Sequence, residues 1–227
     1  YAGHRAAEGR GHSGQELCDL PYLTTGPLAR QWSVRARTFD AFVRHATRPL
    51  ARRLGRPLET LDLGAGNGWL SHRLALEGHR AVALDIRGDE VDGLGAAAAL
   101  ARRAPGRIAR VVGSFEAIPL RPASVDLAVF NASLHYALDL SRALAEAARV
   151  VRPGGVLAIL DSPVYRRERD GRRMAAEKRA QGAERFGDRA ANLLSLPFIE
   201  FLTRERLRTA SAGPGLRWRR RRVLYPA

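Results

Sequence analysis

The sequence has very little cysteine and lysine: Cys18 and Lys178 are the only residues of these types among 227. A single cysteine excludes a disulfide framework within the chain and favours a reducing compartment. No apolar run approaches the roughly 18 residues that a membrane-spanning helix needs. The N-terminus also lacks the apolar core of a signal peptide. We therefore expect a cytoplasmic protein with no membrane span.

Acidic residues are outnumbered, and the formal net charge is +15. Nearly all the basic residues are arginine, and alanine and glycine are abundant, which indicates a bias of genome composition more than a selected surface. The positive field still attracts anions, so a nucleic-acid substrate stays open as the less favoured alternative. Hydrophobic residues make up 45% of the chain, which is typical of a globular protein, and the length suits one domain.

The stretch from 61 to 70, LDLGAGNGWL, organises the chain. A short apolar segment leads into alternating glycines, and a segment that favours helix follows, as where a strand turns tightly into a helix N-terminus. A dinucleotide fingerprint, G-x-G-x-x-G, would need glycine where Trp69 stands. Asp62 would also repel a pyrophosphate. A carboxylate at this position suits a ligand that carries positive charge.

A second apolar strand is predicted from Arg80 to Ile86. It ends in Asp85, about 20 residues past the glycines, where an acid can bind the two hydroxyls of a ribose. Ile86 would then lie against one face of the attached base. The alternative is an acid that stands at a strand end by chance, and the spacing from the glycine turn disfavours it.

Three further segments follow in order: GSFEAIPL at 113–120, NASLHY at 131–136 after a strand over 125–130, and RPGG at 152–155 before a strand over 156–160. With the glycine turn and Asp85, these segments resemble the landmarks of class I S-adenosylmethionine-dependent methyltransferases. The resemblance runs from about residue 58 to 161, and the landmarks stand in the family's order.

The resemblance implies an α/β fold with a doubly wound, mostly parallel sheet of strand order 3-2-1-4-5 and helices on both faces. It implies S-adenosyl-L-methionine as cofactor, with the ammonium near Asp62, the ribose on Asp85 and the adenine near Ser114. Ser114 departs from the family pattern, which has an acid there, so the hydrogen bond to the adenine amino group should be weaker. The full set of expected cofactor contacts is Asp62, Gly64, Ala65, Gly66, Asn67, Asp85, Ile86, Ser114, Phe115, Glu116 and Asn131.

The favoured function is methyl transfer to a small-molecule acceptor by in-line displacement, in which the protein mainly positions the nucleophile. His135 is the candidate general base because its ordinary pKa lies near neutrality, and Tyr136 would shape the pocket. The alternative for His135 is a structural or stacking role. No metal site is indicated. Methylation of RNA or protein through arginine-rich segments, and a non-catalytic cofactor-binding protein, remain open, and the oligomeric state is not determined.

Three parts are expected: an N-terminal segment and helical arm over 1–55, a cofactor-binding core over 56–162, and a lid-like helical segment with a C-terminal helix and strand over 163–227. The arm should be helical from Leu28 to Leu54 and kinked or split at Pro49, with Tyr22, Trp32 or Arg35 able to reach the cofactor. Trp32 could instead be a packing residue. A charged helix over 166–189 would be either a solvated surface or a lid. A final strand over 216–225 is expected without the seventh strand that usually pairs with it.

Overall fold

The computed structural model describes residue 12 and residues 14–186 and 197–223. Its centre is a five-stranded parallel sheet of order β3-β2-β1-β4-β5, which confirms the predicted fold class and strand order. The strands are β1 (Glu59–Leu63), β2 (Arg80–Asp85), β3 (Ile108–Val112), β4 (Val125–Asn131) and β5 (Val151–Leu160). Leu63 pairs with Leu84 on one side and Phe130 on the other. The carboxyl ends of β1, β2 and β4 therefore meet at one edge.

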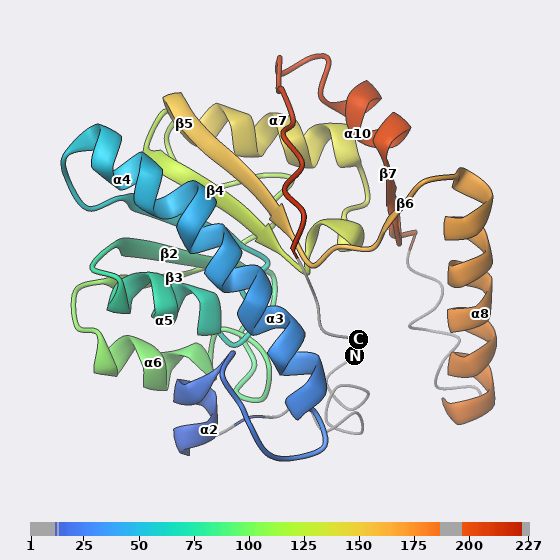
Figure 1. The fold of residues 1–227 in the computed structure, drawn as a ribbon, viewed down its shortest axis with the longest axis horizontal. Coiled ribbons are helices and arrows are strands. Elements are labelled where there is room, and N and C mark those ends of the chain that lie inside the picture. Colours follow the sequence, from blue (N-terminus) through green and yellow to red (C-terminus); the bar gives the residue numbers. More distant parts are fainter. Residues whose placement is uncertain (1–11, 13, 187–196, 224–227) are drawn as a thin grey trace.

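The central strands are apolar on both faces, as expected where helices cover a parallel sheet on both sides. Every residue of β4 is buried. On one face lie α3 (Ala29–Phe42), α4 (Arg48–Leu54), α5 (Trp69–Leu76) and α6 (Ala97–Arg103), whose apolar residues form one core cluster. On the other face lie α7 (Leu140–Val150) and α10 (Arg204–Ala210), which share a second cluster with the segment after β3 (Figure 1). Among the described residues, no helix is both long and apolar enough to cross a membrane.

The N-terminal arm is one continuous helical run from residue 29 to 54, preceded by the short helix α2 (Gly14–Asp19). Its middle is the π-helical segment η1 (Val43–Thr47), and Pro49 stands in the first turn of α4. Proline has no backbone N–H to donate within a helix, and a π-helical turn absorbs that defect. The expected split at Pro49 is not seen: the run stays helical, with the π-helical turn just before the proline. Figure 1 shows the arm crossing one face of the sheet.

Several element boundaries differ from the sequence expectations. The predicted C-terminal strand is wrong for the residues described: 216–223 contain no strand, and 224–225 lie outside the described residues. Leu216 and Trp218 pack against the α7 cluster instead, and the Trp218 indole N–H donates to the Ser211 hydroxyl. Side-chain packing onto the core therefore replaces main-chain pairing at this end. The RPGG segment was expected as a turn, but it lies inside β5 at an irregularity in the β4–β5 register.

The charged segment forms the long helix α8 (Glu168–Phe186), beside the two-residue pair β6 (Val164–Tyr165) and β7 (Leu202–Thr203). The hydroxyl of Thr203 caps α10 by accepting from the Arg206 N–H, as the sequence predicted. α8 lies at one side of the molecule, away from the sheet (Figure 1). Gly171 and Ala175 are buried on the side of α8 that meets Phe201, which is 3% exposed. Two ion pairs, Glu168–Arg206 and Arg179–Glu200, also join α8 to the rest of the protein.

We expect Gly171→Ala to loosen α8 from the body of the protein. A Cβ on Gly171 would lie 2.1 Å from the Phe201 ring, so the ring or the helix must move. Overpacking of this kind costs about 1–3 kcal/mol, against a gain of about 1 kcal/mol in helix propensity. Limited proteolysis of α8 should therefore be faster in the variant. The control is Ala176→Gly, an exposed position in α8 that changes propensity without a clash; slower cleavage of Gly171→Ala than of wild type would contradict the packing account.

Candidate cofactor and acceptor site

The glycine turn after β1 is held by close backbone packing. Gly64 and Gly68 have φ angles of +73° and +76°, which residues with a side chain rarely adopt. A Cβ on Gly64 would lie 2.5 Å from the Cβ of Ser133, in the loop after β4. The Gly64 and Ala65 N–H groups both donate to the Leu84 carbonyl at the end of β2. These contacts fix the turn at the point where three strands end.

Asn67 lies within the same turn and is buried, as is Ala65. Its side-chain oxygen accepts from the Trp69 N–H at 3.3 Å, at the start of α5. This bond orders the helix N-terminus, where backbone N–H groups and the helix dipole can face a polar ligand. A direct contact of Asn67 with a ligand stays a prediction.

Asp62 is an acid in the core, with 1% of its surface exposed. One carboxylate oxygen accepts from the Ser71 hydroxyl of α5 at 2.9 Å, and the other has no hydrogen-bond partner among the described residues. Burial raises the pKa of Asp62 to about 7, and the bond from Ser71 opposes that rise. A buried carboxylate without a full set of partners is costly, so a cationic ligand here would be strongly favoured. Ser71 was not singled out in the sequence.

Asp85 ends β2, and it accepts the Gly66 N–H at 2.7 Å and the Arg87 N–H at 2.8 Å. Burial raises its pKa, and these two bonds oppose the rise. Its charge also raises the pKa of Asp62, so the two carboxyl groups lie close enough to interact. The structure therefore brings the two acids to neighbouring strand ends, either side of the glycine turn. Ile86 follows with 73% of its surface exposed, so its side chain is open to solvent.

The segment after β2 was expected to be helical from residue 90, but α6 begins only at Ala97. The preceding residues form a loop ordered by Asp89, whose carboxylate accepts the N–H groups of Val91 and Asp92. This loop approaches the turn: the Asp92 carbonyl would lie 3.3 Å from a Cβ on Gly66. The Asp89 carboxylate accepts hydrogen bonds from backbone N–H groups that would otherwise be available to a helix, so a loop forms here although alanine-rich sequence favours helix.

Ser114, Phe115 and Glu116 follow β3. The Ser114 hydroxyl accepts the Glu116 N–H at 3.1 Å, and the Phe115 ring packs edge-on against Phe130 at 5.4 Å. The Glu116 carboxylate accepts the N–H groups of Leu138 and Asp139. These bonds join this loop to the loop after β4. The binding of an adenine by Ser114, Phe115 and Glu116 stays a prediction.

Asn131, His135 and Tyr136 lie at or beyond the carboxyl end of β4. Asn131 is 9% exposed, and its side-chain oxygen has no hydrogen-bond partner among the described residues. The His135 and Tyr136 rings lie 4.2 Å apart, and Phe198 packs edge-on against Tyr136 at 5.5 Å. The backbone of His135 also accepts the Glu200 N–H. His135 is therefore part of a packed aromatic wall.

Tyr22, Trp32 and Arg35, the residues expected to reach the cofactor, each contact other side chains of the protein. Trp32 is 7% exposed and packs edge-on against Trp69 at 5.7 Å, which supports the packing interpretation. The Tyr22 hydroxyl donates to Asp40 at 2.7 Å. Arg35 places its guanidinium 5.1 Å from the centre of the Trp32 ring.

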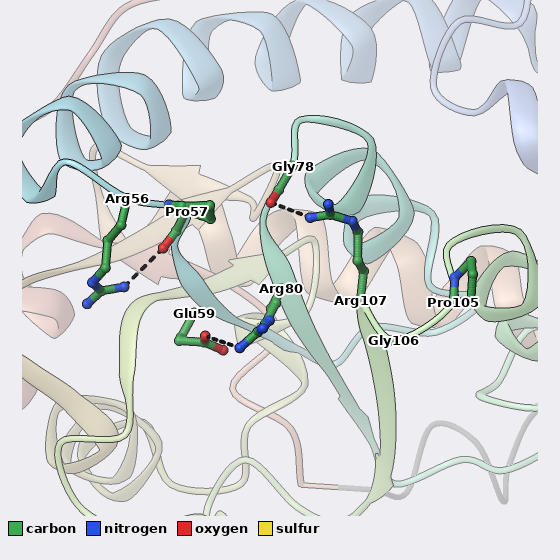
Figure 2. A pocket seen from close by; sticks show the side chains of 8 residues that line it. All are labelled: Arg56, Pro57, Glu59, Gly78, Arg80, Pro105, Gly106 and Arg107. Atoms are coloured by element: carbon green, nitrogen blue, oxygen red, sulfur yellow. Dashed lines mark hydrogen bonds and ion pairs between the residues drawn. The ribbon is translucent and has the colours of Figure 1, made fainter.

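A cavity of about 480 Å³ lies at the opposite edge of the sheet, where the strands begin (Figure 2). Its arginines are bound to protein acceptors: Arg107 donates to the Gly78 carbonyl, Arg80 pairs with Glu59, and Arg56 holds Asp126 with two bonds of 2.8 Å. This edge is remote from the glycine turn, so we do not assign it to the cofactor.

The fold and the site define a class of protein. A doubly wound sheet binds its ligand at the switch point of strand order, which here lies between β1 and β4. The glycine turn, Asp62 and Asn131 all lie at that point, and Asp85 lies one strand away. This arrangement is that of a nucleoside-binding α/β protein.

Comparison with known proteins specifies the family of that domain. Residues 61–159 match the family model described as a methyltransferase domain. The chain is 36% identical over 97 residues to a malonyl-[acyl-carrier protein] O-methyltransferase from Yersinia pestis, and 41% identical over 100 residues to an uncharacterized methyltransferase from Mycobacterium bovis. Residues 61–159 are therefore similar to a methyltransferase domain, in line with the resemblance seen in the sequence.

These matches cover 43% and 44% of this chain, and 34% and 38% of the respective relatives. The chain thus spans well under half the length of the curated relatives it matches. A solved structure, of a proposed sarcosine dimethylglycine methyltransferase from Galdieria sulphuraria, is 19% identical with a TM-score of 0.59, and the alignment covers 93% of this chain and 72% of that one. At this identity the likeness concerns the fold alone.

Proposed function

We propose that the chain is an S-adenosylmethionine-dependent methyltransferase that acts on a small-molecule acceptor. One observation carries the proposal: a buried acid with an unpartnered oxygen, Asp62, lies beside the glycine turn, with Asp85 at the next strand end. An ammonium suits the first acid, and a ribose diol suits the second. The matched methyltransferase domain supports the same cofactor.

In this proposal the chain's own residues bind and orient the reactants. Asp62 binds the amino group of the methionine end, Asp85 accepts from the ribose hydroxyls, and the glycine turn lets the backbone approach without a Cβ in the way. Bound S-adenosylmethionine supplies an electrophilic methyl group on a sulfonium. The residues after β4 would place the acceptor opposite the leaving sulfur, and this positioning supplies most of the rate.

Methylation of a carboxyl group on an acyl carrier is the second candidate. The Yersinia pestis relative is named for malonyl-[acyl-carrier protein], as is one from Methylococcus capsulatus that is 41% identical over 112 residues. These matches cover 43% and 47% of this chain, and 34% and 38% of the relatives. The similarity therefore supports methyl transfer as the reaction and says less about which acceptor is methylated.

Asp85→Ala tests the cofactor assignment. Loss of charge-assisted hydrogen bonds to the ribose should weaken S-adenosylmethionine binding by about 2 kcal/mol, or roughly thirtyfold, in a calorimetric titration. NAD serves as the comparison ligand, because Trp69 and Asp62 disfavour a dinucleotide. Tight NAD binding without S-adenosylmethionine binding would refute the proposal, and an unchanged affinity in Asp85→Ala would remove the ribose contact.

A further inference from the structure

A second pair of buried polar groups lies at the carboxyl end of β5. Asp161 follows the strand directly and has a φ angle of +49°, a conformation that side-chain-bearing residues adopt rarely. A carboxylate oxygen of Asp161 and the hydroxyl of Ser162 are both buried, and neither has a hydrogen-bond partner among the described residues. Backbone strain and buried polar atoms without partners concentrate at functional sites. The methyltransferase landmarks do not account for these residues.

The arm helix α3 covers this pair. Thr38 hydrogen bonds with the Asp161 carboxyl group, and the charge of Arg35 faces it. Burial raises the pKa of Asp161, while Thr38 and Arg35 oppose that rise. Arg35 also lies over the Trp32 ring, so its guanidinium is held in place. The arm thus supports the carboxylate without occupying all its oxygen atoms.

The position of Asp161 relative to the glycine turn follows from the sheet register. Asn131 at the end of β4 is paired with Leu160, and Leu63 at the end of β1 is paired with Phe130. Asp161 therefore ends the strand next to the post-β4 loop, on the side away from Asp85. The nucleoside is proposed to lie over the ends of β1 and β2, which would leave the ends of β4 and β5 for the acceptor. The acceptor would then meet Asn131 and Asp161.

His135, the base expected from the sequence, is held in a packed wall at the end of β4. Its ring lies against Tyr136, and its backbone joins the loop to residues 199–200. The carboxylate of Asp161, at the end of β5, keeps a buried oxygen that no described group uses.

We propose that Asp161, assisted by Ser162, binds the hydrogen-bond donor of the acceptor and takes its proton, so that the acceptor is an alcohol, phenol or amine and not a carboxylate. This inference rests on the proposed function. The acceptor's oxygen or nitrogen forms the new bond to the methyl carbon as the carbon–sulfur bond breaks, and that electron pair stays on sulfur. The acceptor's proton passes to the Asp161 carboxylate and then to water. A carboxylate acceptor has no proton to give and would be repelled by Asp161.

The test measures binding of two probes, benzylamine and benzoate, to protein saturated with S-adenosylhomocysteine, by ligand-detected NMR at fixed ionic strength. Asp161→Asn should weaken benzylamine binding about tenfold and leave benzoate binding equal or tighter. The control Glu177→Gln, an exposed carboxylate on α8, should change neither. Equal benzylamine affinity in wild type and Asp161→Asn would overturn the inference.

Two further measurements separate the possible failures. S-adenosylhomocysteine affinity should be the same in wild type and Asp161→Asn; absence of binding in wild type would refute the proposed function and not the role of Asp161. If Asp161→Asn does not fold, Ser162→Ala replaces it, with an expected threefold loss of benzylamine affinity, and an unchanged affinity there counts against the inference.

Discussion

Replacing Asp62 with asparagine is expected to weaken S-adenosylmethionine binding by ten- to a hundredfold at pH 8. Asparagine keeps the shape of the side chain and can still accept from the Ser71 hydroxyl, but it carries no charge for the ammonium group. Loss of a charge-assisted hydrogen bond in a buried site costs about 1.5–3 kcal/mol. Calorimetric titration at pH 8 measures the change directly.

The same substitution should stabilise the protein without ligand at that pH. The pKa of Asp62 rises from 3.8 to about 7 on folding because the carboxyl group is buried. Between these values the unfolded chain has released a proton that the folded chain still holds, so the free energy of unfolding falls as pH rises from about 4 to 7. Asp62→Asn removes this dependence and should gain about 4 kcal/mol at pH 8, with no gain at pH 4.

Glu59→Gln is the matched control, because Glu59 is an acid on the same strand at the opposite edge of the sheet. It should leave cofactor affinity unchanged. If Asp62→Asn binds S-adenosylmethionine as wild type does, the ammonium contact is wrong. If Asp62→Asn is also no more stable than wild type at pH 8, burying the ionised Asp62 carboxylate does not destabilise the protein.

Asp126→Ala should give the largest loss of stability among the changes considered. Asp126 is the second residue of β4, and 2% of its side chain is exposed. It accepts two hydrogen bonds from Arg56, one from Arg152, and one from the Glu59 N–H at 2.9 Å. Its removal leaves two guanidinium groups and a backbone N–H without their acceptor. The Arg56 and Arg152 side chains are 44% and 35% exposed, so water can solvate them and the loss should be about 2 kcal/mol, below that of a fully buried pair. Urea unfolding at pH 7 tests the prediction.

The pH dependence of this contribution runs opposite to that of Asp62. The arginine and backbone donors lower the pKa of Asp126 to about 2, against 3.8 for the ordinary group. Its contribution is thus complete above pH 4 and is lost as pH falls toward 2, so wild type and Asp126→Ala should converge in acid. Glu205→Ala is the control: its pair with Arg208 is 73% exposed on both sides, and its loss should have no measurable effect. A similar loss in both variants would contradict the network account.

The core fold could be predicted because local signals and burial agreed. Strands β2 and β4 lie where the apolar patterning placed them, within one residue at each end. The sequence predicted secondary structure less well where a segment becomes a strand only if another strand is available to pair with it. The alternating apolar residues near Leu216 and Trp218 are compatible with a strand, but their side chains pack onto the α7 cluster. Sequence pattern indicates which residues are buried, and it does not reveal whether a neighbouring strand is present.

The sequence by itself predicted the acids and glycines that meet at the carboxyl edge of the sheet. Asp62, the glycines and Asp85 are close to one another along the chain or joined by one helix, so motif spacing was enough to find them. Only the tertiary structure decided the contacts between distant segments. Asp126 accepts from Arg56, Arg152 and the Glu59 N–H, and the arm residues Arg35 and Thr38 face Asp161. Contacts of this kind depend on how the arm and the strands pack together, so they cannot be predicted from short sequence patterns.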